Sequence, residues 1–164
     1  MEHEEQHTTF KDYFLFAGVL LGIVLISIFI SYAAKTDAVG FMRVFMGVFF
    51  LTFGVFKLLD WDGFVESFVN YDLIAIKYKD YAQAYPIIEI VLALGYFLNF
   101  YFVNYITLVV TTIGGISVIL QLMGGRKIRC ACLGTYINIP LSTVSLIEDI
   151  AMAAMAILLL ILKF

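Results

Sequence analysis

Charged residues are scarce in this chain, and several familiar functional motifs are missing from it. Only 14% of the 164 residues are charged, whereas 63% are hydrophobic, and the net charge is −3 at pH 7. Soluble domains are about a quarter charged and about half apolar, so this composition excludes a soluble globular domain. The acidic balance excludes nucleic acid as a partner, because binding to phosphates needs a basic surface. The sequence also lacks a glycine-rich phosphate loop, a serine nucleophile elbow and a zinc-protease helix motif, which argues against a kinase or a hydrolase.

Long apolar runs predict an all-α integral membrane protein with five transmembrane helices. A spanning helix needs about 20 residues, so the chain has room for one compact membrane domain and no separate soluble domain. The predicted spans cover residues 13–34, 41–59, 86–103, 105–123 and 141–164. Residues 1–12 form an acidic tail where a signal peptide would be basic, so we expect the first run to be retained as a helix.

One long connection, residues 61–85, joins the second and third predicted spans. Aromatic side chains and alanines recur along it at helical spacing, and charged residues lie between them. The aromatic residues and alanines are Phe64, Phe68, Tyr71, Ala75, Tyr78 and Ala82. This pattern predicts an interfacial helical segment whose aromatic face enters the acyl boundary of the lipid bilayer. A lid packed over the end of the helix bundle would produce the same pattern.

Small residues that let helices approach each other closely recur in the predicted spans. They include Gly18 and Gly22 in the first span, Gly47 and Gly54 in the second, and Gly114 and Gly115 in the fourth. We expect these positions to face neighbouring helices of the bundle, while the oligomeric state stays open.

Ionisable residues lie near the ends of the predicted spans, and all of them fall on one side of the membrane. Five spans place the amino-terminal tail, residues 61–85 and the 124–140 loop on that side. Ionisable residues in membrane helices are costly and usually functional; here they are Lys57, Asp60, Glu89, Glu148 and Asp149. We therefore predict a polar membrane site in which Lys57 and Glu89 form an ion pair.

Each of these residues, taken singly, also has a structural explanation. Lys57 suits the negative pole at the end of its helix. Pro86 followed by Glu89 is typical of a helix that begins at a proline. Ser145 and Glu148 have the spacing of a capping box at the start of the last span.

The two cysteines of the chain form a Cys130-Ala-Cys132 motif in the 124–140 loop, directly after three basic residues. Neighbouring cations favour the reactive thiolate. A disulfide in so short a ring would be strained and easily reduced, which suits a catalytic or sensing pair. In this hypothesis Cys130 attacks and Cys132 resolves, and Glu148 or Asp149 shuttles protons, provided that its protonation changes near the working pH.

Soft-metal binding is the main alternative for this motif. Two thiolates would suit Cu(I), with Met152 and Met155 or the tail residues His3 and His7 as further donors, whereas zinc would need four ligands. A third hypothesis is a structural subunit of a respiratory or export membrane complex, in which the cysteines have no chemical role.

Several motifs from Arg43 onward match the pattern of known membrane families. They are Arg43 with Gly47, the run Gly54-Val-Phe-Lys57-Leu-Leu-Asp60, Pro86-Ile-Ile-Glu89, and Cys130-Ala-Cys132-Leu-Gly134 ahead of Pro140 and Glu148-Asp149. In these residues the chain resembles the DoxX and MauE families, which are redox-associated bacterial membrane proteins. The resemblance implies a four-helix core over residues 41–164, with the helix at 13–34 as an addition. It also implies a place in the bacterial inner membrane.

The same resemblance implies a role for the cysteine pair. It makes Cys130 and Cys132 a redox pair in an accessory protein that performs or assists thiol–disulfide exchange, since MauE proteins help a periplasmic dehydrogenase reach its disulfide-bonded form. DoxX relatives are instead linked to quinone-coupled sulfur oxidation. A self-contained quinone-coupled enzyme relays electrons between two cysteine pairs, and this chain has one. The expected exchange partner is therefore another redox or exported protein.

The side of the membrane that carries the cysteine motif stays open at this point. Basic residues are more numerous on the side of the 124–140 loop, which favours the cytoplasm. The family resemblance favours the periplasm.

Overall fold

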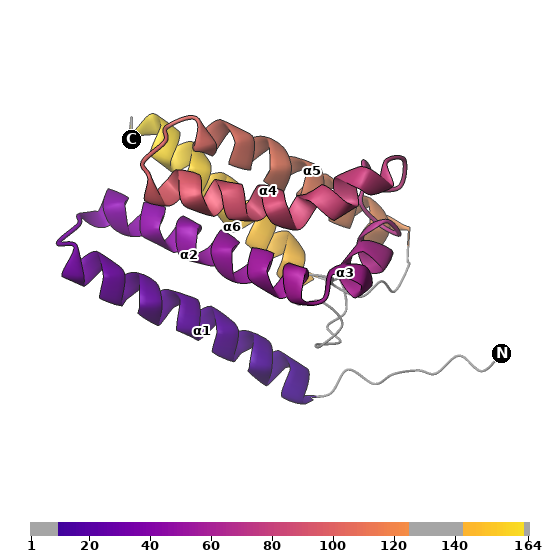
Figure 1. Ribbon diagram of the computed structural model, residues 1–164, viewed down its shortest axis with the longest axis horizontal. Helices are drawn as coiled ribbons and strands as arrows, with labels where there is room; N and C mark the ends of the chain where they lie inside the picture. Colours follow the sequence, from indigo (N-terminus) through magenta and orange to yellow (C-terminus); the bar gives the residue numbers. More distant parts are fainter. Residues whose placement is uncertain (1–9, 125–142, 163–164) are drawn as a thin grey trace.

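The computed structural model describes residues 10–124 and 143–162, and all regular structure within them is α-helical. The helices are α1 (Phe10–Ala33), α2 (Ala38–Leu59), α3 (Trp61–Phe68), α4 (Lys79–Phe97), α5 (Val103–Met123) and α6 (Thr143–Ile161). Figure 1 shows an up-and-down bundle with α1 along its outside and the short α3 at one end. The predicted all-α class is confirmed.

Within the described residues, three helices are long and apolar enough to cross a membrane, namely residues Phe14–Ala33 of α1, all of α2 and all of α5. The other two predicted spans correspond to α4 and α6, which have 19 residues each. Neither is among the candidate spans found in that part of the chain, so the five-span count is not confirmed and stays a prediction for α4 and α6.

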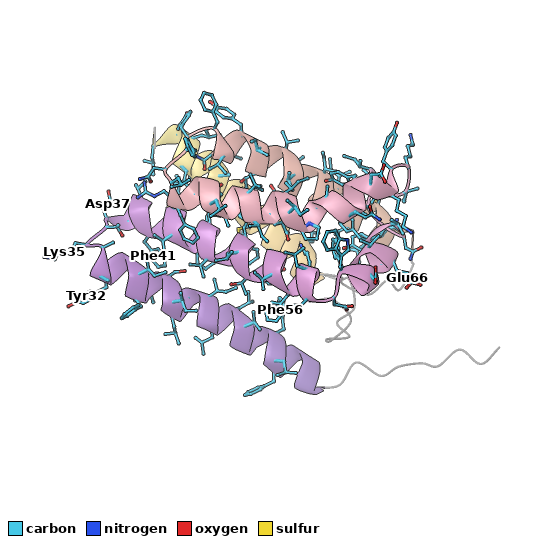
Figure 2. All side chains as sticks on the ribbon, in the orientation of Figure 1. Tyr32, Lys35, Asp37, Phe41, Phe56 and Glu66 are labelled. Carbon is cyan, nitrogen blue, oxygen red and sulfur yellow. The ribbon has the colours of Figure 1, made fainter. Side chains whose placement is uncertain are left out.

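Short turns join the long helices, and polar side chains fix where two of them begin and end. Asp37 caps the start of α2, where its Oδ1 accepts a hydrogen bond of 2.9 Å from the backbone N–H of Gly40. Asn99, in the turn between α4 and α5, has a φ of 63°, a left-handed conformation that asparagine tolerates. Tyr32, Lys35 and Asp37 mark one end of the bundle, and Glu66 marks the other (Figure 2).

The second helix is the centre of the bundle, because α1, α4 and α6 all pack against it. Its aromatic side chains fill the core: the rings of Phe49 and Phe53 lie 4.5 Å apart, and Phe50 stacks on Tyr96 of α4. Phe16 of α1 reaches Phe53 with a centroid distance of 6.5 Å. Burial of these large rings between the helices stabilises the bundle.

The sequence predicted that the small residues face other helices, but only some of them do. A Cβ atom at Gly54 would lie 3.0 Å from Ile90 and 3.3 Å from the Pro86 carbonyl oxygen, so α2 and α4 cross closely there. Around Gly18 and Gly22, in contrast, nothing lies within 4 Å of such an atom. The prediction was wrong for this pair, because only one face of α1 packs on α2 and these glycines lie on the other.

The predicted helical segment at residues 61–85 is helical in part and is interrupted in the middle. The helix α3 ends at Phe68, turns follow, and α4 begins at Lys79. Asp72 stabilises the turns between them, because its Oδ1 accepts hydrogen bonds of 2.9 Å from the backbone N–H groups of Ile74 and Ala75. A side chain that takes these donors competes with the helical pattern.

The aromatic face of this connection is buried in protein. Phe64, Phe68 and Tyr71 are at most 6% exposed and pack with Val118 of α5, whereas Tyr78 is 67% exposed. This burial agrees with the lid over the bundle end and not with an aromatic face inserted into lipid.

Two predicted helix starts also differ from the structure. Pro86 lies inside α4, seven residues after its first residue Lys79, and does not begin the helix. Proline is tolerated within membrane helices when neighbouring groups satisfy the freed backbone. Ser145 likewise lies within α6, which begins at Thr143, so it is not at the N-cap position.

Candidate functional site

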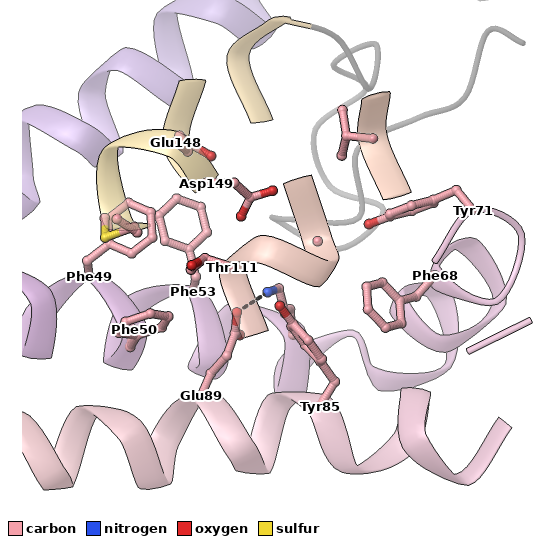
Figure 3. Close-up of a pocket in the computed structure, with 14 residues that line it drawn as sticks. Phe49, Phe50, Phe53, Phe68, Tyr71, Tyr85, Glu89, Thr111, Glu148 and Asp149 are labelled. Atoms are coloured by element: carbon pink, nitrogen blue, oxygen red, sulfur yellow. Dashed lines mark hydrogen bonds and ion pairs between the residues drawn. The ribbon is translucent and has the colours of Figure 1, made fainter. Parts of the chain in front are cut away.

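A small cavity of about 70 Å³ opens among α2, α4, α5 and α6, near the end of the bundle that α3 covers. Figure 3 shows that phenylalanine and tyrosine rings form much of its wall and that acidic side chains enter it from α4 and α6. Its polar lining residues are Lys57, Tyr71, Tyr85, Glu89, Thr111, Glu148 and Asp149.

The predicted pair of Lys57 and Glu89 is present in the structure. Lys57 Nζ donates a hydrogen bond to Glu89 Oε1, and the two side chains are only 8% and 6% exposed. The ammonium also lies 4.9 Å from the ring centroid of Tyr85 and 5.4 Å from that of Phe64. Cation–π attraction from these rings adds to the ion pair, so Lys57 is held from both sides.

Two further acids face this pair across the cavity. Glu148 and Asp149 lie in the first half of α6, and both line the cavity with Lys57 and Glu89 (Figure 3). Two buried carboxyl oxygens, Glu89 Oε2 and Glu148 Oε1, have no hydrogen-bond partner among the described residues. Four of the predicted residues, Lys57, Glu89, Glu148 and Asp149, thus form one polar cluster among aromatic side chains.

The fifth helix makes room for the acids of α6. A Cβ atom at Gly114 would lie 3.3 Å from Asp149 Oδ2, so the absence of a side chain there lets the carboxyl approach α5. One turn earlier, Thr111 lines the same cavity while its Oγ1 donates a hydrogen bond of 2.8 Å to the carbonyl of Thr107. Its hydroxyl proton is used within α5, so its oxygen is an acceptor toward the cavity.

Not all predicted site residues meet here. Asp60 is half-buried at the junction of α2 and α3 and is not part of the cavity wall. Met152 lines the cavity, whereas Met155 packs against the hydrophobic core. The motif residues Cys130 and Cys132 and the tail residues His3 and His7 lie outside the described residues. Within the described ranges no group of three or more His, Cys, Asp or Glu side chains is arranged to bind a metal ion.

The sequence reasoning missed the neutral half of the site. Tyr85 precedes Glu89 by four residues, and Thr111, Gly114 and Val118 follow a three-and-four spacing, so each set shares a helix face. This periodicity was visible in the sequence. It carried no sign of function, since aromatic and small residues at helical spacing are ordinary in any membrane bundle.

A family profile described as Methylamine utilisation protein MauE matches residues 15–162. The chain belongs to the MauE family. The match includes most of α1 as well as the helices on which the resemblance rested, and no curated protein and no solved structure matches the chain. As a MauE-family protein with apolar helices of membrane-spanning length, it is a multi-pass protein of a lipid bilayer.

Proposed function

We propose that this MauE-family protein is a five-span accessory protein of the bacterial inner membrane that performs or assists thiol–disulfide exchange through Cys130 and Cys132. The family description suggests that it serves methylamine utilisation, and its exchange partner is an exported or redox protein. One observation carries the proposal. The helix α5 ends and α6 begins at the end of the bundle that holds the acidic cavity, and both cysteines fall between these two helices in the sequence.

Chain length supports this juxtaposition. Cys130 is six residues beyond Gly124, and an extended chain covers about 3.3–3.6 Å per residue. The thiol is therefore tethered within about 20 Å of the end of α5, at the end of the bundle where α6 begins and where Glu148 and Asp149 lie in its first half. No other stretch of the chain contains a thiol.

The exchange proceeds in two balanced steps. The Cys130 thiolate attacks one sulfur of a disulfide in the partner protein, which forms a mixed disulfide and releases the other sulfur of that bond as a thiolate. The Cys132 thiolate then attacks the Cys130 sulfur, which closes the Cys130–Cys132 disulfide and frees the partner. Two electrons and two protons pass from the pair to the partner, and the reverse sequence oxidises a dithiol in the partner.

The acids of α6 supply a route for those protons. Glu148 and Asp149 lie next to a cavity large enough for a few water molecules, because a single water needs only about 10–15 Å³ of such volume. In this proposal one of them takes up or returns a thiol proton through water during exchange. They act as proton shuttles and not as ligands of the partner.

The lengths of α4 and α6 support the proposal of five spans. Each has 19 residues, which at about 1.5 Å per residue gives roughly 28 Å, close to the thickness of about 30 Å of the hydrocarbon core. Glu89 of α4 and the pair Glu148 and Asp149 of α6 line the bundle cavity, where they avoid lipid. Ionisable residues in membrane helices generally face the bundle interior in this way.

Thiol alkylation in intact cells tests the proposal. A membrane-impermeant maleimide should label Cys130 and Cys132 only after reduction, since an exchange-competent pair facing exported proteins is oxidised at rest. A Cys132→Ser variant should accumulate a mixed disulfide with its partner, because the resolving thiol is gone, and the matched Cys130→Ser variant should not. Labelling only after lysis, or no trapped adduct, would contradict the proposal.

The same variants separate the two alternatives. A Cu(I)-transfer protein would contain copper after anaerobic purification and would lose it on Cys132→Ser. A purely structural subunit would function normally with either cysteine replaced. Met152 is the one predicted sulfur donor that lines the described cavity, and no other described residue favours the copper alternative.

A further inference from the structure

The acidic cavity has more negative groups than its one lysine can balance. Three carboxyl groups, from Glu89, Glu148 and Asp149, share the wall with Lys57, the only cationic side chain among the described lining residues. With all four groups ionised, the cluster carries a charge of −2. Uncompensated charge away from water is costly, so a second cation or bound protons must offset it.

Unpaired carboxyl oxygens belong to two of the acids that line the cavity. Glu89 is 4% exposed, and its Oε1 accepts the hydrogen bond from Lys57. Its Oε2 and Glu148 Oε1 are buried and have no hydrogen-bond partner among the described residues. Two lining acids from different helices thus each keep an unused acceptor, and buried acceptors require a donor.

The existing contacts of Lys57 indicate which donor suits this space. The lysine ammonium is bound by a carboxylate and by the faces of Tyr85 and Phe64. The same kinds of group, carboxyl oxygens and aromatic rings, line the remaining wall with Phe49, Phe53 and Tyr71. A cation with N–H donors satisfies both kinds of wall, since it donates to the acids and lies against the rings.

Size and charge restrict the ligand further. The cavity of about 70 Å³ is far below the roughly 300–1,000 Å³ of sites for drug-sized ligands. An anion is excluded by the acids. A hard metal ion would need several converging oxygen ligands, and the described residues offer no such metal-binding group.

We propose that this cavity binds a small ammonium cation of the R–NH₃⁺ class, with the carboxyl groups of Glu148, Asp149 and Glu89 as acceptors and the aromatic rings as its walls. Such a group comes from a free primary amine or from the headgroup of phosphatidylethanolamine. The site does not use the cysteine pair, so it stands or falls independently of the exchange activity.

Calorimetric titration of the full chain with methylammonium chloride tests this site. The protein is placed in phosphatidylcholine nanodiscs, and sodium chloride keeps the ionic strength constant. We expect saturable binding of methylammonium and none of tetramethylammonium, which has no N–H donor and exceeds the cavity. Binding should persist in a Cys130→Ser/Cys132→Ser protein.

Two variants locate the ligand. Asp149→Asn removes one charged acceptor and should raise the Kd for methylammonium by at least about tenfold, whereas Asp62→Asn, on an exposed carboxyl of α3, should leave it unchanged. Gly114→Ala keeps every charge but places a methyl group 3.3 Å from Asp149 Oδ2. It should also weaken binding, with thermal unfolding used to confirm that both variants are folded.

Nanodiscs that contain phosphatidylethanolamine distinguish the two sources of the ammonium group. Loss of methylammonium binding in them would assign the site to the lipid headgroup, and equal binding would assign it to a free amine; both results support an ammonium site. Heat that tracks proton uptake alone, equal binding of tetramethylammonium, or an unchanged Kd in folded Asp149→Asn would overturn the proposal.

Discussion

Lys57 is the one positive charge that the described residues contribute to the site, so it alone offsets the negative charge of the acids. Its ammonium is buried, pairs with Glu89, and faces Glu148 and Asp149 across the cavity. Removing a charge from a buried cluster hurts most when the remaining charges have no substitute partner. The loss of Lys57 leaves three acids without a cation, whereas the loss of Glu89 leaves the lysine with two.

Lys57→Met should therefore destabilise the protein more than Glu89→Gln. We expect Lys57→Met to lower the free energy of unfolding by about 3–5 kcal/mol and Glu89→Gln by clearly less. Denaturant unfolding in detergent micelles, followed by circular dichroism, measures both. Glu66→Gln, on an exposed acid of α3, is the control and should change little. Equal losses of unfolding free energy in both site variants would show that Glu148 and Asp149 do not interact electrostatically with Lys57.

Much of this charged cluster could be predicted from the sequence, because ionisable residues stand out in apolar helices. Lys57, Glu89, Glu148 and Asp149 were each visible as exceptions, and helix parity brought them to one side. The sequence did not give the distances between these residues. Asp60 met every sequence criterion that Lys57 met, yet the chain turns into α3 at that residue and leaves it outside the cavity.

At the scale of helices, the crossing of α2 and α4 at Gly54 sets the position of the ion pair. The glycine lies one turn before Lys57, and its neighbours across the crossing include the Glu89 Cβ atom. A methyl group at this position would push the two helices apart, since one of its contacts is backbone. The same displacement of the helices would move Lys57 away from Glu89.

Gly54→Ala should destabilise the protein by about 1–3 kcal/mol, the usual cost of overpacking. The same substitution at Gly18 should be neutral or stabilising, because nothing lies near that position and alanine favours helix over glycine by about 0.5–1 kcal/mol. Thermal unfolding of the two variants side by side measures the difference. A loss at Gly18 that matches the loss at Gly54 would contradict the packing described here.

The segment between α3 and α4 depends on Asp72 in a comparable way. Asp72 is 1% exposed, caps the turn through Ile74 and Ala75, and accepts a hydrogen bond of 3.2 Å from Ser117 Oγ of α5. Periodicity alone predicted a helix through this region. The sequence pattern did not reveal that one buried carboxylate caps the turn after α3 and ties the segment to α5.

Asp72→Ala should release this segment while leaving the bundle folded. Unsatisfied backbone donors cost about 1–3 kcal/mol, and the loss falls on this segment, while the hydrogen bonds from Leu73 N–H to Ser117 Oγ and from Gln121 to the Tyr71 carbonyl remain. Hydrogen–deuterium exchange should become faster over residues 69–78 and stay unchanged in α1. Uniformly faster exchange across all helices would instead mean that Asp72 supports the whole fold.

The complete molecule raises the question of how many helices cross the bilayer. If α4 crosses, the α2–α3 junction and the α4–α5 turn lie on opposite sides of the membrane. Asp62→Cys and Phe100→Cys probe these two places, since both residues are exposed. In a Cys130→Ser/Cys132→Ser background, an impermeant maleimide should label one of them in intact cells and the other only after lysis. Labelling of both from the same side would exclude a crossing by α4.

Successive long helices run in alternating directions, which explains why the sequence predicted the overall arrangement of the helices better than their boundaries and side-chain contacts. The order of the helices alone places the start of α1, the end of α2, the segment with α3 and the start of α6 at one end, as Figure 1 shows. This arrangement needs only the number of long helices. Helix boundaries and side-chain contacts depend on local competition, such as that at Asp72 or Pro86, which hydropathy does not detect.

The single lysine among three acids also restricts how the family can diverge. A lineage that loses Lys57 first passes through a protein with three uncompensated acids, and selection removes it. A lineage that first exchanges an acid for a neutral residue lowers the negative charge of the cluster from −2 to −1, so a later loss of the lysine leaves two uncompensated acids instead of three. Relatives without this lysine should therefore also lack at least one of Glu89, Glu148 and Asp149, while relatives that lack an acid can retain the lysine.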